Sequence, residues 1–140
     1  MWILGLSEGS ARLAASLGVG FCFSLHHTGR EDGPALIRLY RDSFVASPEF
    51  PEPAPLVVVR CVCAASEAEA KALEDEQVVP PNPVQETILG SPDACAARLK
   101  KIAADFSTTE VMIIDFIRND QDVRREMYRL LGEVLGLLGS

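Results

Sequence analysis

The residues of this chain that are best suited to chemistry gather in one stretch near its amino terminus. A run of small and hydroxyl-bearing residues follows the apolar segment 2–6 and precedes a helical pattern that ends at Gly18; its members are Ser7, Glu8, Gly9, Ser10 and Ala11. Ser7 is a candidate N-cap, and the free backbone N–H groups at the start of a helix bind anions. The pattern predicts a strand, a phosphate-holding turn and a helix, and a plain tight turn is the alternative interpretation.

Two neighbouring histidines and a polar triplet form the other candidate positions. His26 and His27 end a second apolar run, and Arg118, Asn119 and Asp120 follow a later one. Functional groups of parallel α/β folds lie at the carboxyl ends of the strands. For the histidines, the alternative is that they are solvated or capping residues of a loop.

The four cysteines indicate buried, reduced thiols. Cys22, Cys61 and Cys63 lie in apolar strand-like runs and Cys95 lies among alanines. The spacing of Cys61 and Cys63 places both side chains on one face of a strand. Because no second Cys or His pair stands at a zinc-like spacing, we predict structural thiols and no metal site.

The composition is that of one globular domain over residues 1–140. Hydrophobic residues make up 48% of the chain and the formal net charge is −7, which argues against binding to nucleic acid or to an anionic membrane surface. No apolar run is long enough to span a bilayer, and the amino terminus lacks the features of a signal peptide. We therefore expect a cytoplasmic protein.

Strand-like and helix-like segments alternate along the sequence. Strands are expected near residues 2–6, 20–26, 56–64 and 110–117, the first of them apolar enough to be buried on both faces. Helices are expected after Gly33, after the capping-box pattern Ser66 to Glu69, after Ser91-Pro92, and from Asp120 or Asp122. This alternation predicts an α/β fold with a parallel sheet.

The order of these motifs resembles the second half of the bacterial luciferase-like flavin-dependent monooxygenases. The likeness rests on residues 2–18, on the Phe-rich strand that ends in His26-His27, on the helix opening Leu89-Gly90-Ser91-Pro92, and on the strand 110–117. The family fold is a (β/α)8 TIM barrel that uses reduced FMN or a related flavin with O2 to oxidise small organic substrates. The resemblance implies that this chain is a half-barrel, matching the fifth to eighth units.

The resemblance also implies roles for particular residues. Ser7 and Ser10 match the family's positions around the flavin phosphate, and the backbone N–H groups of residues Glu8 to Ala11, including Gly9, would assist them. Leu25 falls where some members place an aromatic residue beside the flavin ring, and His26 falls at the barrel mouth. The family's catalytic histidine belongs to the first four units, so the resemblance identifies no catalytic residue here.

A half-barrel exposes two sheet edges and an apolar concave face, which must be covered. We therefore expect a homodimer formed through the sheet, or association with a separate first-half chain. One hypothesis is an FMN-dependent monooxygenase, truncated, that acts on a small organic substrate. The alternative is a non-catalytic half-barrel that dimerises and retains at most flavin or phosphate binding. A third is an unrelated parallel α/β ligand-binding domain.

Overall fold

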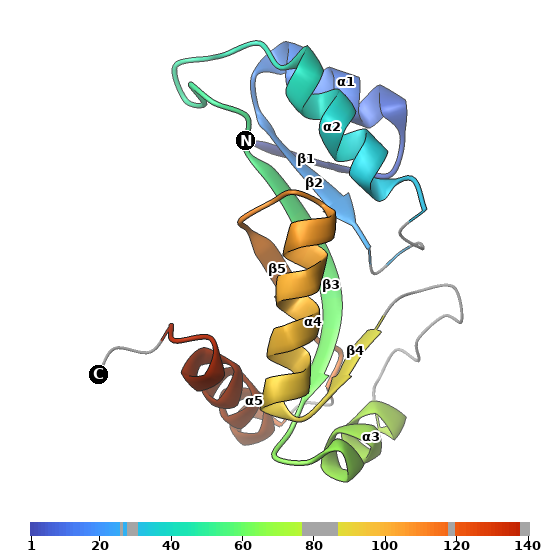
Figure 1. The fold of residues 1–140 in the computed structure, drawn as a ribbon, viewed down its shortest axis with the longest axis vertical. Helices are drawn as coiled ribbons and strands as arrows, with labels where there is room; N and C mark the ends of the chain where they lie inside the picture. Colours follow the sequence, from blue (N-terminus) through green and yellow to red (C-terminus); the bar gives the residue numbers. More distant parts are fainter. Residues whose placement is uncertain (26, 28–30, 77–86, 118–119, 138–140) are drawn as a thin grey trace.

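In the computed structural model, strands and helices alternate along the chain (Figure 1). The structure describes residues 1–25, 27, 31–76, 87–117 and 120–137. Its elements are β1 (Trp2–Gly5), α1 (Glu8–Leu17), β2 (Gly20–Ser24), α2 (Gly33–Ser43), β3 (Pro55–Cys63), α3 (Glu67–Asp75), β4 (Thr87–Gly90), α4 (Pro92–Asp105), β5 (Val111–Ile114) and α5 (Gln121–Val134). The predicted α/β class is confirmed, and β1, β2, β3 and β5 lie near the four positions where strands are expected. His26, the proline-rich residues 78–83, Arg118 and Asn119 lie outside the described residues.

All strand pairs in the sheet are parallel, and β3 is its central strand. β1 pairs with β2, and β2 pairs with β3 over residues 55–58. β4 pairs with residues 60–63 of β3, while β5 pairs with residues 57–60. Figure 1 shows β2 and β4 on one side of β3 and β5 on the other. The arrangement is that of half a TIM-barrel-like fold.

Strand β4 is an addition to the sequence prediction, which placed no strand between residues 64 and 110. The strand has four residues and pairs with the carboxyl half of β3, from Arg60 opposite Thr87 to Cys63 opposite Gly90. A segment this short has too few positions to show an alternating pattern. Its pairing with β3 defines it as a strand.

Four helices, α1, α2, α4 and α5, cover one face of the sheet and form the main core. Strand residues Phe21, Phe23, Val57, Val59 and Cys61 point into this core and are almost fully buried. Each helix contributes apolar residues spaced three or four positions apart, among them Ala11, Ala15, Ile37, Tyr40, Leu99, Ile102, Met127 and Leu131. The apolar stripes of the sequence are therefore core residues, as their helical spacing predicts.

The opposite side of the sheet, here called the open face, is apolar and largely uncovered at its amino end. Cys22, Leu56 and Val58 form a small cluster there. Beside them, Leu4 is 54% exposed and Met112 is 50% exposed, and these side chains line a cavity of about 740 Å³. The prediction that residues 2–6 are buried on both faces is wrong, because nothing in the described chain covers this side of β1.

The helix ends follow the capping residues of the sequence. Ser66 accepts a hydrogen bond from the Glu69 backbone N–H at 3.2 Å, and Asp120 accepts from the backbone N–H groups of Asp122 and Val123. Asp120, rather than Asp122, is thus the N-cap of α5. Gly18 ends α1 in the left-handed conformation, with φ of 62°.

All four cysteines are buried free thiols, as predicted. Cys61 and Cys63 share the helix-covered face of β3, as their spacing predicts, and interact with the Cys95 thiol at the start of α4. Burial of Cys22 raises the pKa of its thiol to about 11. Within the described residues, no group of three His, Cys, Asp or Glu side chains is arranged to hold a metal ion.

Replacing Gly18 with alanine is expected to destabilise the fold strongly. A Cβ atom at this position would lie 2.5 Å from the Val45 carbonyl oxygen, and the positive φ is itself unfavourable for alanine. We expect Gly18→Ala to lower the free energy of unfolding by about 2–4 kcal/mol in urea titrations. Gly136→Ala is the matched control, since Gly136 has φ of 69° and no atom within 4 Å of the added Cβ; it should cost only about 1 kcal/mol. Equal losses would contradict the steric argument.

The raised pKa of Cys22 predicts a loss of stability at alkaline pH. The folded state holds the thiol proton more tightly than the unfolded chain, so this stabilisation is complete below pH 9 and falls as the pH rises to about 11. Over that interval we expect Cys22 to contribute a decrease of roughly 2–3 kcal/mol in the free energy of unfolding. Denaturant titrations at several pH values should show a shallower decrease for Cys22→Ala.

Val58→Ala serves as the control for this alkaline transition. Val58 lies in the same small cluster as Cys22 but does not titrate. Its truncation should lower stability equally at each pH and leave the slope against pH unchanged. An unchanged slope in Cys22→Ala would overturn the assignment.

Candidate functional site

The amino end of α1 is closed by a reciprocal pair of serines. Ser7 is the N-cap, and its Oγ accepts a hydrogen bond from the Ser10 backbone N–H at 3.3 Å. In return, the Ser7 backbone N–H donates to Ser10 Oγ at 3.2 Å, and Ser10 Oγ donates to the Ser7 carbonyl oxygen at 2.8 Å. Both predicted serines are thus brought together, and each hydroxyl first serves to hold the turn.

Glycines at positions 5 and 9 lie on the two sides of this turn, one against α1 and the other toward open space. A Cβ atom at Gly5 would lie 2.1 Å from Ser10 Oγ, so only glycine at the end of β1 lets the helix approach the strand this closely. At Gly9 an added Cβ would meet only Ser7 Oγ, at 3.8 Å. Glu8 is exposed and lies 4.0 Å from Arg12, while Ala11 is fully buried in the core.

This helix end suits a phosphate. The first backbone N–H groups of a helix have no intrahelical acceptor and carry the positive end of the dipole. At α1 these are the N–H groups of Glu8 and Gly9, because that of Ser10 donates to Ser7 and that of Ala11 to the Ser7 carbonyl oxygen. The residues present therefore fit the phosphate group of a flavin mononucleotide.

At the carboxyl end of β2, Leu25 and Ser24 lie on opposite faces of the sheet. Leu25 is fully buried in the main core, on the helix-covered face. Ser24 lies on the open face, where its Oγ is 2.7 Å from Nδ1 of His27. His26 lies outside the described residues. Sequence analysis missed Ser24, although it alternates with Phe21, Phe23 and Leu25 and is the polar member of the opposite face.

A buried arginine stands further along the open face, and sequence analysis assigned it no role. Arg60 is 1% exposed, and its guanidinium carbon lies 4.6 Å from the centre of the Phe116 ring. Burial lowers the pKa of Arg60, and the nearby Glu74 carboxylate partly offsets this. Its neighbour across the ladder, Thr87, has a buried hydroxyl for which no described residue provides a hydrogen-bond partner. The signal was visible in the sequence: Arg60 is the one charged residue in a nine-residue apolar strand.

Comparisons with known proteins identify relatives about twice as long as this chain. No family model matches it. The uncharacterized protein YceB of Bacillus subtilis is 26% identical, and the match covers 96% of this chain and 49% of YceB. The uncharacterized protein YwcH of the same organism is 27% identical, with 95% of this chain and 49% of YwcH covered. The chain therefore spans about half the length of these curated relatives.

Solved structures give the same picture of the fold. Apo-MsnO8 matches with a TM-score of 0.83 and 27% identity, covering 99% of this chain and 52% of MsnO8. The monooxygenase RslO1 from Streptomyces bottropensis matches with a TM-score of 0.73 and 19% identity, over 97% of this chain and 47% of RslO1. The oxygenating constituent of 3,6-diketocamphane monooxygenase from Pseudomonas putida, solved in complex with FMN, matches with a TM-score of 0.63 and 14% identity, over 93% and 46% of the two chains.

These matches confirm the resemblance inferred from the sequence. Each covers nearly all of this chain and about half of the longer protein, in agreement with a parallel sheet whose open face is uncovered by the described residues at its amino end. Within the described part of the chain, no helix is long and apolar enough to cross a membrane. The chain is a structural relative of the luciferase-like flavin monooxygenases and corresponds to about half of their barrel.

Proposed function

We propose that this chain is the phosphate-binding half of an FMN-dependent, luciferase-like monooxygenase. In this proposal it joins a second half-barrel, and the assembly oxidises a small organic substrate with reduced FMN and O2. The general family is supported by the monooxygenase structures that share the fold, one of them solved with FMN. The identity of the flavin and the reaction are inferences from this relationship.

The observation that carries the proposal is the amino end of α1. Two backbone N–H groups, Glu8 and Gly9, lie at the positive end of the helix dipole, and the Ser7–Ser10 pair holds them in place. Gly9 has no side chain to obstruct a bound anion. Because α1 follows β1 directly, this site lies at the carboxyl end of a barrel strand, where ligands of such folds bind.

The other residues of the chain would shape the site around the cofactor. A bound flavin supplies the redox chemistry itself. In the proposal the apolar open face, with Leu56 and Val58 at its centre, excludes water once it is covered. Arg60 would contribute positive charge to the carboxyl half of that face.

We propose a second copy of this chain as the half-barrel that completes the assembly. β1 and β5 are outer strands of the sheet, as is the short β4, and each of them pairs with one strand only within the described residues. In a two-fold dimer, β1 of each copy would lie parallel to β5 of its partner and the two open faces would form one interior. A separate chain that corresponds to the missing half is the alternative occupant.

A second candidate function is a non-catalytic half-barrel that dimerises. It is supported by the exposed apolar side chains of the open face, Leu4 at 54% and Met112 at 50%, which a dimer would cover. In that case phosphate or flavin binding would persist without turnover. Binding and turnover assays on the same sample separate the two functions.

Removal of the serine pair is expected to weaken FMN binding. We predict that the double variant Ser7→Ala with Ser10→Ala raises the dissociation constant for FMN about tenfold, since the turn that presents the Glu8 and Gly9 N–H groups loses its hydrogen bonds. Quenching of flavin fluorescence on titration with protein measures this.

Ser66→Ala is the matched control for the loss of a helix cap. Ser66 caps the amino end of α3 through a hydrogen bond from the Glu69 backbone N–H, and it belongs to a different strand–helix unit from Ser7. Its substitution should cost about 1 kcal/mol of stability and leave FMN binding unchanged. If FMN does not bind the folded wild-type protein, or binds equally well to the double variant, the phosphate site is excluded.

A charge placed on the open face is expected to disrupt the dimer. Leu4 on β1 is 54% exposed and Leu13 on α1 is 51% exposed, but only Leu4 lies on the open face. We predict a monomer for Leu4→Lys and an unchanged dimer for Leu13→Lys in size-exclusion chromatography with light scattering. A wild-type monomer at micromolar concentration would contradict the homodimer and leave a separate half-barrel chain as the occupant.

A further inference from the structure

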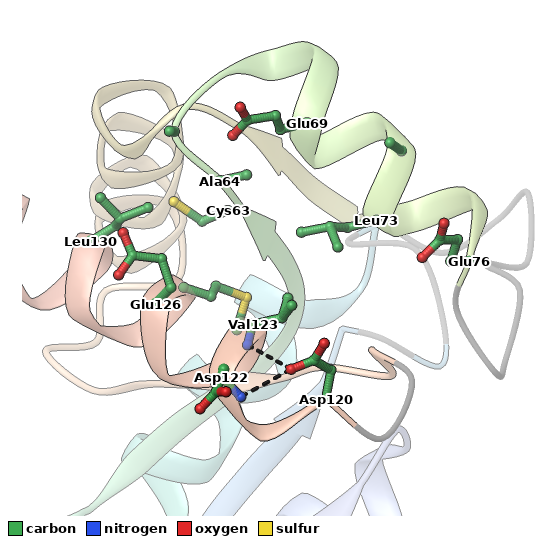
Figure 2. Close-up of a pocket in the computed structure, with 13 residues that line it drawn as sticks. Cys63, Ala64, Glu69, Leu73, Glu76, Asp120, Asp122, Val123, Glu126 and Leu130 are labelled. Carbon is green, nitrogen blue, oxygen red and sulfur yellow. Dashed lines mark hydrogen bonds between the residues drawn. The ribbon is translucent and has the colours of Figure 1, made fainter.

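A second cavity lies between α3 and α5, at the carboxyl ends of β3 and β5, and it takes no part in the proposed function. Its volume is about 600 Å³, within the range of small-molecule sites. The floor is apolar and includes Ala64, Leu73, Val123 and Leu130. Figure 2 shows these side chains between the two helices.

The described residues on the rim of this cavity carry carboxylates as their ionisable groups, and the Cys63 thiol lies on its floor. Glu69 and Glu76 stand on the α3 side and Asp120, Asp122 and Glu126 on the α5 side (Figure 2). Among the described residues that line the cavity, there is no lysine, arginine or histidine. The cavity therefore selects by charge as well as by shape.

The carboxylates differ in the hydrogen bonds and ion pairs that they already form with neighbouring residues. Asp120 accepts two backbone N–H groups at the start of α5, Asp122 lies 3.5 Å from Arg125, and Glu126 lies 2.8 Å from Arg129. Within the described residues, Glu69 and Glu76 form no ion pair. The α3 side thus offers two carboxylates to a ligand.

We propose that this cavity binds a small organic cation with an apolar body, such as a protonated alkylamine. The apolar floor buries the hydrocarbon part, and the rim carboxylates pair with the ammonium group. An anionic ligand of the same size is rejected, because its charge would face carboxylates on both sides. Position adds to this argument, since ligands of parallel α/β folds bind at the carboxyl ends of strands. The inference does not rest on flavin binding.

Three probes of equal chain length test the proposal on the full chain without flavin. Hexylammonium, hexanol and hexanoate are titrated into isotope-labelled protein, and the amide resonances of Ala64, Ala65 and Val123 are followed by NMR. We expect saturable shifts with hexylammonium, binding about tenfold weaker with hexanol, and none with hexanoate. Equal binding of hexylammonium and hexanoate, or no shift at millimolar hexylammonium, overturns the proposal.

Two pairs of variants separate the cavity from general effects of charge and surface. Ala72 and Ala68 are exposed residues of α3, but only Ala72 lines the cavity. Ala72→Trp should abolish hexylammonium binding and Ala68→Trp should leave it unchanged. The double variant Glu69→Gln with Glu76→Gln should weaken binding about fivefold.

A control of equal net charge completes the test. Asp42 and Glu52 are exposed and lie outside the cavity. Asp42→Asn with Glu52→Gln should therefore leave the affinity for hexylammonium unchanged. If both double variants weaken binding equally, the attraction is a property of the whole acidic surface and the proposed site is excluded. Because all the substituted residues are exposed, the amide spectra also report that each variant is folded.

Discussion

A parallel sheet is stable when apolar groups cover both of its faces, and the described part of this chain covers one face fully and the other only at its carboxyl end, where α3 packs on it. Helices α1, α2, α4 and α5 pack on one side and bury strand residues such as Phe23 and Val59 almost completely. On the other side, the cluster around Val58 merges with the half-exposed Leu4 and Met112. The strands nevertheless carry apolar side chains on both faces. This pattern is typical of a sheet that is covered on both sides.

The candidate phosphate site is independent of that missing cover. It is built from local contacts: the Ser7–Ser10 hydrogen bonds, the glycine at position 5, and the burial of Ala11 against β1 and β2. These contacts form within a single strand–turn–helix unit. The geometry of this candidate site therefore does not depend on what covers the open face.

The carboxyl half of the open face has a different character from its amino half. Ser24, Arg60 and Thr87 bring polar groups into an otherwise apolar surface, and α3 packs over Val62 and Leu89 nearby. Burial of a guanidinium group is costly unless aromatic or charged neighbours stabilise it. Phe116 and Glu74 provide such neighbours for Arg60. The polar part of the face therefore lies where ligands of parallel α/β folds bind.

The sequence by itself determined the order of strands and helices, the caps at Ser7 and Ser66, and the αL residue Gly18, because these depend on residues close together in the chain. It also predicted the pairing of Cys61 and Cys63 on one face, since side chains alternate along a strand. Only the tertiary structure decided that β4 is a strand, that the Leu4 side of β1 is uncovered, and that α3 and α5 enclose an acidic cavity. Each of these depends on which distant segments lie side by side, and apolar periodicity alone carries no information about the partner that a face receives.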